Sequence, residues 1–406
     1  MNLLSKVRRS LADEGLAATW KKILLRWGAG QGMPGDQAFA LHMARLYPLP
    51  LPLTPPPGTP NPRRWVLHWV LPDFHQGGGG HMTLMRLINW LESQGHDCRL
   101  WINGATAHAD AAAAKAFLDR HYLPTRATLG ILHRDNLHLL EGDAVIATDC
   151  WTAYPASQVQ KVRQRFYLVQ DFEPSFHPQG SLSLLAENTY KMGFFAITAG
   201  KWLQELMSGY GMEACSFDLA FDPAVYQPRP GAKRPCSIAF YARRGTPRRA
   251  VELGLLALEQ LHQGLPQLEV SFFGNKHPLP PQPFRVRDLG ILDHAGLAKL
   301  YNEVELGMSF SSTNYSLIPQ EMMACGLAVL ELDLASTRAA FEPGSVAMAA
   351  PWPQEIAQNA MALLQSPVRR QEQALAGLAA VQGLSWAASG KAVEAALRQG
   401  LRLPPA

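Results

Sequence analysis

Four arginines stand at one expected strand-to-helix junction, in the stretch FYARRGTPRR. Arg243 and Arg244 follow an apolar run typical of a strand, and Arg248 and Arg249 fall at the start of the helix expected after it. Cations are disfavoured at a helix N-terminus unless an anion joins them. The guanidinium fork also suits phosphate oxygens. The junction therefore indicates a diphosphate site, with a solvated basic turn as the alternative.

A single acid, Glu321, stands at the head of an apolar helix that we expect to begin near Pro319. The preceding stretch, STNYS, is rich in small polar residues. A carboxylate in this position can stabilise the helix dipole by a few tenths of a kcal/mol. It can also accept hydrogen bonds from two hydroxyl groups of a ribose. The local sequence leaves both interpretations open.

A run of four glycines, Gly77 to Gly80, lies between an expected strand and an expected helix. Glycines leave the backbone unobstructed, so that N–H groups at a helix N-terminus can meet an anion. The run lacks the Lys-Ser/Thr pair of an ATPase phosphate loop and the spacing of a dinucleotide fingerprint. A tight turn that binds nothing is the alternative.

Expected strands and helices alternate in two series, which the proline-rich stretch FDPAVYQPRPGAKRP separates. The expected strands cover residues 64–71, 97–103, 144–149, 165–171 and 194–200, then 236–242, 268–274, 305–311 and 327–333. The expected helices cover residues 81–95, 201–211, 248–263, 294–304 and 319–326. This alternation predicts an α/β protein with two Rossmann-like parallel-sheet domains. Their strand ends would face each other across a cleft, where such sheets bind ligands.

The bulk composition predicts a globular protein, because 47% of the 406 residues are hydrophobic and 17% are charged. We expect an extension over residues 1–62, domains over 63–228 and 229–385, and a C-terminal helix over 386–406 that returns to the first domain. Five scattered cysteines show neither a zinc site nor a disulfide framework, which fits a reducing cytosol.

Residues 1–30 carry six Lys and Arg against two Asp and Glu, which accounts for the whole formal net charge of +4. The positive and negative charges of the remaining chain are equal in number, so a nucleic-acid partner is not expected.

The stretch LAATWKKILLRW is amphipathic, and it would either lie on an anionic membrane surface or pack on the body of the protein. No stretch resembles a signal peptide or a spanning helix. We therefore expect a cytoplasmic protein, with the periphery of the inner membrane face as a further option. The proline-rich residues 47–62 predict a strap over the surface.

The second series resembles the donor half of a GT-B glycosyltransferase of glycosyltransferase family 4. The similarity lies in FYARRGTPRRA, in VRDLGILDHAGLAKLYNEVELGMSFS and in EMMACG, and it extends over roughly residues 64–390. The residues that match the family motifs are Arg243, Arg248, Leu289, Gly290, Tyr301 and Glu321. The resemblance implies that Arg243 and Arg248, with the backbone of Gly78 and Gly79 across the cleft, bind the donor diphosphate. It implies that Glu321 binds the nucleotide ribose.

One position departs from the family pattern. The residue eight before Glu321 is Thr313, where the family carries an acid that contacts the donor sugar. Thr313, Asn314, Tyr315 and Ser316 would then form a neutral loop facing the sugar. Such a loop would suit a 6-deoxy sugar, which carries a methyl group where other hexoses carry a hydroxymethyl group.

The first series is similar to a branch of rhamnosyltransferases that build bacterial surface glycans. The similarity lies in AVIATDCWTAYPA and FYLVQDFEPSFHPQG. It implies that Asp171 and Glu173 orient hydroxyl groups of the acceptor or of the sugar. The alternative is a pair of loop acids that accept hydrogen bonds from backbone N–H groups. Among the nearby histidines, His75 is the best placed to act at the reaction centre.

These observations predict a glycosyltransferase that moves L-rhamnose from dTDP-L-rhamnose to a growing surface glycan, carried on a lipid. The chain contains no Asp-x-Asp pair, so we expect no metal or other cofactor, with arginines and N–H groups stabilising the leaving diphosphate. The family resemblance implies retention of configuration. The alternatives are a transferase for another hexose, from a UDP or GDP donor, and a non-catalytic glycan-binding protein.

Overall fold

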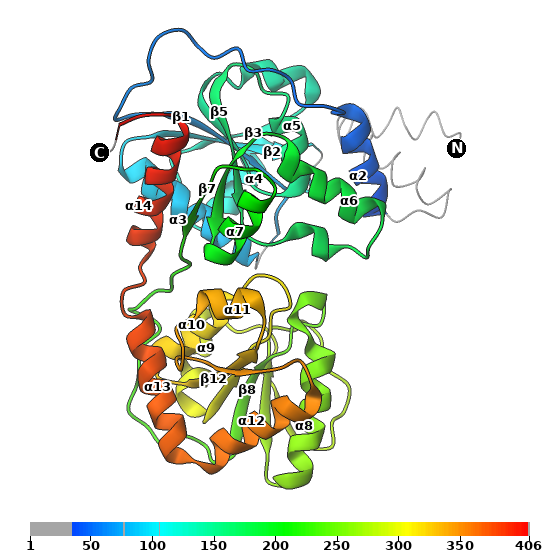
Figure 1. The fold of residues 1–406 in the computed structure, drawn as a ribbon, viewed down its shortest axis with the longest axis vertical. Coiled ribbons are helices and arrows are strands. Elements are labelled where there is room, and N and C mark those ends of the chain that lie inside the picture. Colours follow the sequence, from blue (N-terminus) through cyan, green and yellow to red (C-terminus); the bar gives the residue numbers. More distant parts are fainter. Residues whose placement is uncertain (1–34, 76–77, 105, 405–406) are drawn as a thin grey trace. The chain divides into compact units, whose positions relative to one another are not determined.

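The computed structural model describes residues 35–75, 78–104 and 106–404, which form two compact units (Figure 1). Unit 1 contains the described residues up to Ala199, Leu203–Phe217 and those from Ser389 onward. Unit 2 contains Gly200–Trp202 and Asp218–Ala388. The basic arm over residues 1–30 and Gly77 lie outside the described residues, so the predictions made for them stay predictions.

Unit 1 is built on a seven-stranded parallel sheet in the order β3-β2-β1-β4-β5-β6-β7. Its strands are β1 (Val66–Leu71), β2 (Asp97–Asn103), β3 (Thr128–Leu132), β4 (Gly142–Ala147), β5 (Val162–Val169), β6 (Phe195–Ala199) and β7 (Ala214–Phe217). The central strands are apolar on both faces, as buried parallel strands are. Trp69, Ile146 and Phe166 are all fully buried in this core.

The strands of unit 1 alternate with helices, as a parallel sheet requires. The helices are α2 (Gly35–Leu46), α3 (Gly79–Ser93), α4 (Ala111–His121), α5 (Cys150–Ala156), α6 (Ser181–Asn188), α7 (Lys201–Gly209) and α14 (Trp386–Gly400). Short 3₁₀ turns lie at Arg134–Leu139, Glu173–Phe176 and Thr189–Lys191. The sheet is therefore covered by elements from the start, the middle and the end of the described chain.

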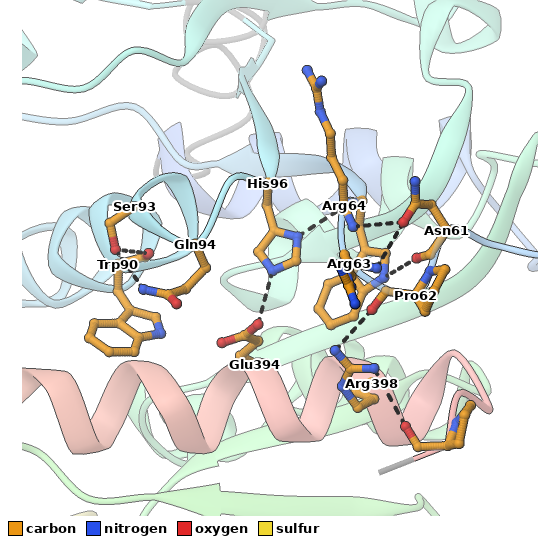
Figure 2. Close-up of polar contacts among 12 residues, drawn as sticks. Asn61, Pro62, Arg63, Arg64, Trp90, Ser93, Gln94, His96, Glu394 and Arg398 are labelled. Carbon is orange, nitrogen blue, oxygen red and sulfur yellow. Dashed lines mark hydrogen bonds and ion pairs between the residues drawn. The ribbon is translucent and has the colours of Figure 1, made fainter. Parts of the chain in front are cut away.

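Helix α14 is held on unit 1 by side chains from α3, from the turn between α3 and β2, and from the segment before β1 (Figure 2). The Arg398 guanidinium donates to the carbonyl oxygen of Pro62 at 3.0 Å and lies 5.2 Å from the Trp65 ring centroid. Glu394 contacts His96, Oε1 to Nε2, at 3.2 Å. Gly390 lies so close to α3 that a Cβ atom there would stand 2.1 Å from Cγ of Trp90. The close approach of α14 to α3 thus depends on the absence of a side chain at residue 390.

The substitution Gly390→Ala should therefore destabilise the protein by about 1–3 kcal/mol, the usual cost of overpacking. This loss should outweigh the gain of roughly 1 kcal/mol that alanine brings to a helix interior. The matched control is Gly209→Ala at the end of α7, where a Cβ atom would meet nothing within 4 Å. Thermal unfolding of the two variants tests this, and equal unfolding temperatures for Gly390→Ala and the wild type would contradict it.

The proline-rich segment before β1 forms a strap held by hydrogen bonds to residues 157–163. Leu51 N–H donates to the Ser157 carbonyl at 3.1 Å, and Thr54 N–H donates to the Gln160 carbonyl at 2.8 Å. The Arg163 guanidinium donates to the Gly58 carbonyl at 2.8 Å. Since proline lacks an N–H group, the strap uses its few N–H groups and its carbonyls for these contacts.

Unit 2 is built on a six-stranded parallel sheet in the order β10-β9-β8-β11-β12-β13. Its strands are β8 (Ser237–Tyr241), β9 (Glu269–Phe273), β10 (Arg285–Asp288), β11 (Leu306–Met308), β12 (Ala328–Leu332) and β13 (Ala347–Ala349). Its helices are α8 (Val251–Gly264), α9 (His294–Glu303), α10 (Leu317–Ala324), α11 (Ala335–Ala340), α12 (Pro353–Gln365) and α13 (Pro367–Val381). A 3₁₀ turn at Pro247–Arg249 precedes α8. The core lies between the sheet and α8 and α12, with Phe240, Leu258 and Ile356 fully buried.

The predicted α/β class with two parallel-sheet units is confirmed. One expected helix start is wrong, because α8 begins at Val251 and not at Arg248. Ala250 adopts a left-handed conformation, with φ of 44°, and separates the 3₁₀ turn from the helix. A regular helix cannot run through a residue in that conformation.

Candidate functional site

The arginine junction of unit 2 follows the carboxyl end of β8. Arg243 is exposed, and its guanidinium makes no hydrogen bond or ion pair within the described part of the chain. Arg244 is engaged by Glu252, Nε to Oε1, at 2.9 Å. Arg248 and Arg249 lie in the 3₁₀ turn before α8 and are half-buried. Arg243 is thus the cation of this junction that is open to a ligand from solvent.

The loop over residues 309–316 meets this junction directly. Ser312 N–H donates to the carbonyl oxygen of Arg248 at 2.8 Å. The loop then ends at Ser316, whose hydroxyl caps α10 by accepting from Ile318 N–H at 3.3 Å. Helix α10 therefore begins two residues before Pro319, and its N-terminus faces the same end of the sheet as the arginines. The structure brings together two motifs that are some seventy residues apart in the sequence.

Glu321 lies in α10 and is only 4% exposed. Its carboxylate is close to Tyr301 of α9. Burial and then the charge of Glu321 raise the pKa of the Tyr301 hydroxyl well above its usual value. The structure thus places two of the motif residues, Tyr301 and Glu321, close together in the interior of unit 2.

The four residues expected to face a sugar are all buried, and three of them have structural contacts. The Tyr315 hydroxyl accepts from Leu219 N–H at 3.2 Å, and its ring packs against Phe341 and Gly200. Ser316 is the cap of α10. Asn314 is 1% exposed, and its carbonyl accepts from the Ser311 hydroxyl at 2.5 Å. Thr313 differs, because its buried hydroxyl has no hydrogen-bond partner within the described residues.

Sequence reasoning missed a buried acid beneath this loop, Glu331 of β12. Its Oε1 atom accepts from Ser311 N–H at 3.0 Å and from Leu332 N–H at 2.9 Å. Burial raises the pKa of Glu331 to about 8, although these two hydrogen bonds and the charge of Arg249 act in the opposite direction. Glu331 thus supports Ser311 in the loop that carries Thr313. The signal was a single acid between Leu330 and Leu332 in an apolar strand.

In unit 1, the glycine run opens α3, with Gly78 as the N-cap residue. The Tyr122 hydroxyl bridges the two sides of the loop. It donates to the carbonyl oxygen of His75 and accepts from Gly78 N–H at 3.2 Å. A Cβ atom on Gly80 would stand 3.4 Å from the Gln170 side chain. Gly80 therefore lies beside the VQDFEP loop, and the His75 side chain is exposed.

The two acids of the VQDFEP loop have different environments. Asp171 is half-buried, and its carboxylate accepts from Phe172 N–H at 2.9 Å. Glu173 is 5% exposed, and its Oε2 atom accepts from the Tyr167 hydroxyl at 2.5 Å.

Close to Glu173 lies a second acid, the half-buried Asp149, which caps α5 by accepting from Thr152 N–H at 2.7 Å. Burial and then the neighbouring Asp149 raise the pKa of Glu173 well above its usual value. Burial also raises the pKa of Asp149 to about 6. Two carboxyl groups so close together in the interior disfavour double ionisation. Burial thus disfavours the ionised form of Glu173, whose carboxyl anchors the loop through Tyr167, and Asp171 is the acid nearer to solvent.

Both units match known proteins of one class. The HepE protein of Anabaena, in a crystal structure with UDP, is similar to 82% of this chain over 100% of its own length, with 15% identity and a TM-score of 0.65. A sucrose-phosphate synthase from Thermosynechococcus elongatus is similar to 82% of this chain over 98% of its own, with 13% identity and a TM-score of 0.60. These likenesses show the fold, which is that of the GT-B glycosyltransferases.

Two family models then identify the lineage within that class. The N-terminal domain of WsaF matches residues 75–199, and the C-terminal domain of WsaF matches residues 236–360. Together they span more than half of the chain, so the chain belongs to the WsaF family. An O-antigen biosynthesis protein, RfbC of Myxococcus xanthus, is 38% identical over 204 residues. That match covers 48% of this chain and 16% of RfbC.

Proposed function

We propose that this protein is a glycosyltransferase that moves a sugar from a nucleoside diphosphate donor to a surface glycan. The observation that carries this proposal is a hydrogen bond that joins two motifs of unit 2. The Ser312 N–H group donates to the backbone carbonyl oxygen of Arg248. This contact sets the arginine junction beside the loop and helix that bear Thr313 and Glu321. A strand-end cluster of cations, a small polar loop and one acid has the groups that a diphosphate, a sugar and a ribose each require.

For the donor, we assign Arg243 and Arg248 to the diphosphate and Glu321 to the pentose of the nucleotide. Of the two glycines assigned to the diphosphate from the sequence, Gly79 would add its N–H group at the start of α3, whereas the N–H of Gly78 already donates to the Tyr122 hydroxyl. Thr313 is the sugar-facing residue that the geometry favours within the group Thr313, Asn314, Tyr315 and Ser316, because its hydroxyl has no partner in the described structure. The HepE structure, which was solved in complex with UDP, supports a nucleoside diphosphate as a ligand of this fold.

The donor that best fits this assignment is dTDP-L-rhamnose. With threonine at position 313 the sugar-facing loop lacks an acid, which suits the apolar C6 methyl group of a 6-deoxy sugar. The similarity to an O-antigen biosynthesis protein supports a bacterial surface polysaccharide as the product. The arginines and N–H groups would stabilise the departing diphosphate without a metal. Attack on the same face as the departing phosphate would retain the configuration of the sugar.

For the acceptor, a glycan or a lipid-linked glycan, we assign Asp171, Glu173 and His75 of unit 1. Asp171 and His75 are the more exposed of the three and would meet hydroxyl groups of the acceptor. Glu173 would act indirectly, by holding the loop that carries Asp171 in place, because its carboxyl accepts a hydrogen bond from the Tyr167 hydroxyl. A lipid-linked acceptor would also give the basic arm over residues 1–30 a membrane surface to bind. Within the described part of the chain, no helix is both long and apolar enough to span a bilayer.

Calorimetric titration with dTDP, UDP and GDP tests the nucleotide assignment. We expect dTDP to bind with a dissociation constant in the micromolar range and more tightly than UDP or GDP. A panel of nucleotide sugars with membrane lipid extract as acceptor, read by mass spectrometry, then tests transfer. The expected product is heavier by one deoxyhexose. Absence of binding by all three nucleotides at millimolar concentration would overturn the proposal, and transfer of another hexose would overturn the donor assignment.

A further inference from the structure

Unit 2 carries a groove between α8 and α12 that the proposed reaction does not use. The groove has a volume of about 780 Å³, within the usual range of ligand clefts of roughly 300–1,000 Å³. The two helices lie side by side (Figure 1). The walls are five glutamines, namely Gln260 and Gln263 on α8 and Gln354, Gln358 and Gln365 on α12. None of the lining residues belongs to the junction of Arg243 or to the helix of Glu321.

The glutamines are exposed, and within the described residues their side chains have no hydrogen-bond partner. Each amide offers two N–H donors and one acceptor oxygen. The other lining residues are small or apolar, with Ala357 and Met361 among them, and none of the ten is charged. The groove therefore combines many uncharged hydrogen-bonding groups, the glutamine amides, with an apolar floor.

A second hollow of about 420 Å³ continues the groove at the start of α12, since Gln260 and Gln354 line both. Trp352 forms its wall and is 67% exposed. Tryptophan is on average a largely buried side chain, and its ring presents a broad apolar face. Glu355 is the one acid on the rim.

We propose that this groove, with Trp352 at its end, is a binding site for a neutral glycan chain. Sugar rings combine hydroxyl groups with apolar C–H faces, which match the amides and the indole ring. An apolar ligand would desolvate the amides without pairing them, which is costly. An anionic ligand would find no cation in the groove. The choice of a glycan rests on the proposed function, whereas the neutrality and hydroxyl content of the ligand follow from the lining residues.

For the reaction, this groove would be a second binding site for the acceptor glycan. A glycan bound at α8 and α12 would remain attached to the protein while its growing end is released from the acceptor residues. The local concentration of the acceptor would then stay high between transfers, as in other two-site binders.

Affinity gel electrophoresis of the full chain tests this site. The gels contain dextran, a neutral rhamnose-containing O-polysaccharide, heparin or a proline-rich peptide. We expect at least one neutral polysaccharide to retard the wild type. Trp352→Ala, and separately Gln354→Ala with Gln358→Ala, should weaken this binding about tenfold. Both changes keep helix-compatible residues in exposed positions. The control is Leu375→Ala, an exposed apolar residue on α13, 59% exposed, which should change nothing.

Nucleotide titration of the same variants separates the two proposals. We expect the Trp352 and glutamine variants to bind the nucleotide as the wild type does, because these residues lie outside the strand-end cluster. Retardation of the wild type and the variants to the same extent would overturn the glycan site. Retardation by the peptide or heparin alone, or by none of the four probes, would overturn it as well.

Discussion

The substitution Glu321→Ala should weaken binding of dTDP about tenfold and binding of UDP about a hundredfold. The difference arises because UDP carries two hydroxyl groups on its ribose and dTDP carries one on its deoxyribose. A hydrogen bond to a charged group contributes about 1.5–3 kcal/mol, and each 1.4 kcal/mol changes affinity tenfold. The substitution Arg243→Ala should instead weaken both nucleotides to a similar extent, by about a hundredfold, because the diphosphate is common to them. Calorimetric titration measures all four constants.

The control for the arginine is Arg244→Ala. Arg244 stands next in the chain but is paired with Glu252, so its loss should change nucleotide affinity less than threefold. An alanine at position 321 that leaves both nucleotides bound as tightly as before would show that Glu321 does not touch the pentose. Its role would then be confined to the helix and to its contact with Tyr301.

The second large effect is a loss of stability with rising pH, caused by Glu331. The native pKa of Glu331 is about 8, against an ordinary value of 4.5 for a glutamate. Between these two values the unfolded chain releases a proton that the folded protein keeps. The free energy of unfolding should therefore fall by roughly 3–5 kcal/mol from pH 4.5 to pH 8 through this residue. Below and above that window the residue should add no further slope.

The substitution Glu331→Gln removes the titrating group and should remove this part of the slope. Urea unfolding of the wild type and the variant at several values between pH 5 and pH 8 gives the difference. The acids Asp149 and Glu173, whose pKa values are also raised, remain in both proteins and cancel. Glu372→Gln, an exposed position on α13, is the control. A variant at 331 as sensitive to pH as the wild type would refute the assignment.

Much of the fold could be predicted from apolar runs. The strand expected over residues 97–103 is β2, Asp97–Asn103, and the other expected strands match to within a few residues. The prediction missed the four edge strands β3, β7, β10 and β13, of which β10, with the sequence RVRD, has a single apolar residue. This strand lies at the edge of its sheet and is largely exposed. An edge strand does not need an apolar run, so periodicity could not reveal it.

Candidate site residues could be proposed from the sequence where one short segment held the signal, and not where distant segments meet. Glu321 and the arginines stand in recognisable local patterns. The contact of the Tyr315 hydroxyl with Leu219 joins residues 96 apart in the chain, and no local pattern contains it. The support that Glu331 gives to Ser311 is of the same kind, because it needs the pairing of β12 with β11. Sequence reasoning thus found the candidate ligands of the donor more easily than the residues that hold them.

The return of the chain to unit 1 at Ser389 determines the order in which the protein can fold during synthesis. Unit 2 is almost continuous in sequence, from Asp218 to Ala388, and is complete before α14 leaves the ribosome. Most of unit 1 is synthesised before unit 2, but α14 is synthesised after it. The contacts of Trp90 with Gly390 and of Trp65 with Arg398 can therefore form only after unit 2 has been synthesised. Domains generally fold from the N-terminus during translation. Here the half that is synthesised first is completed last.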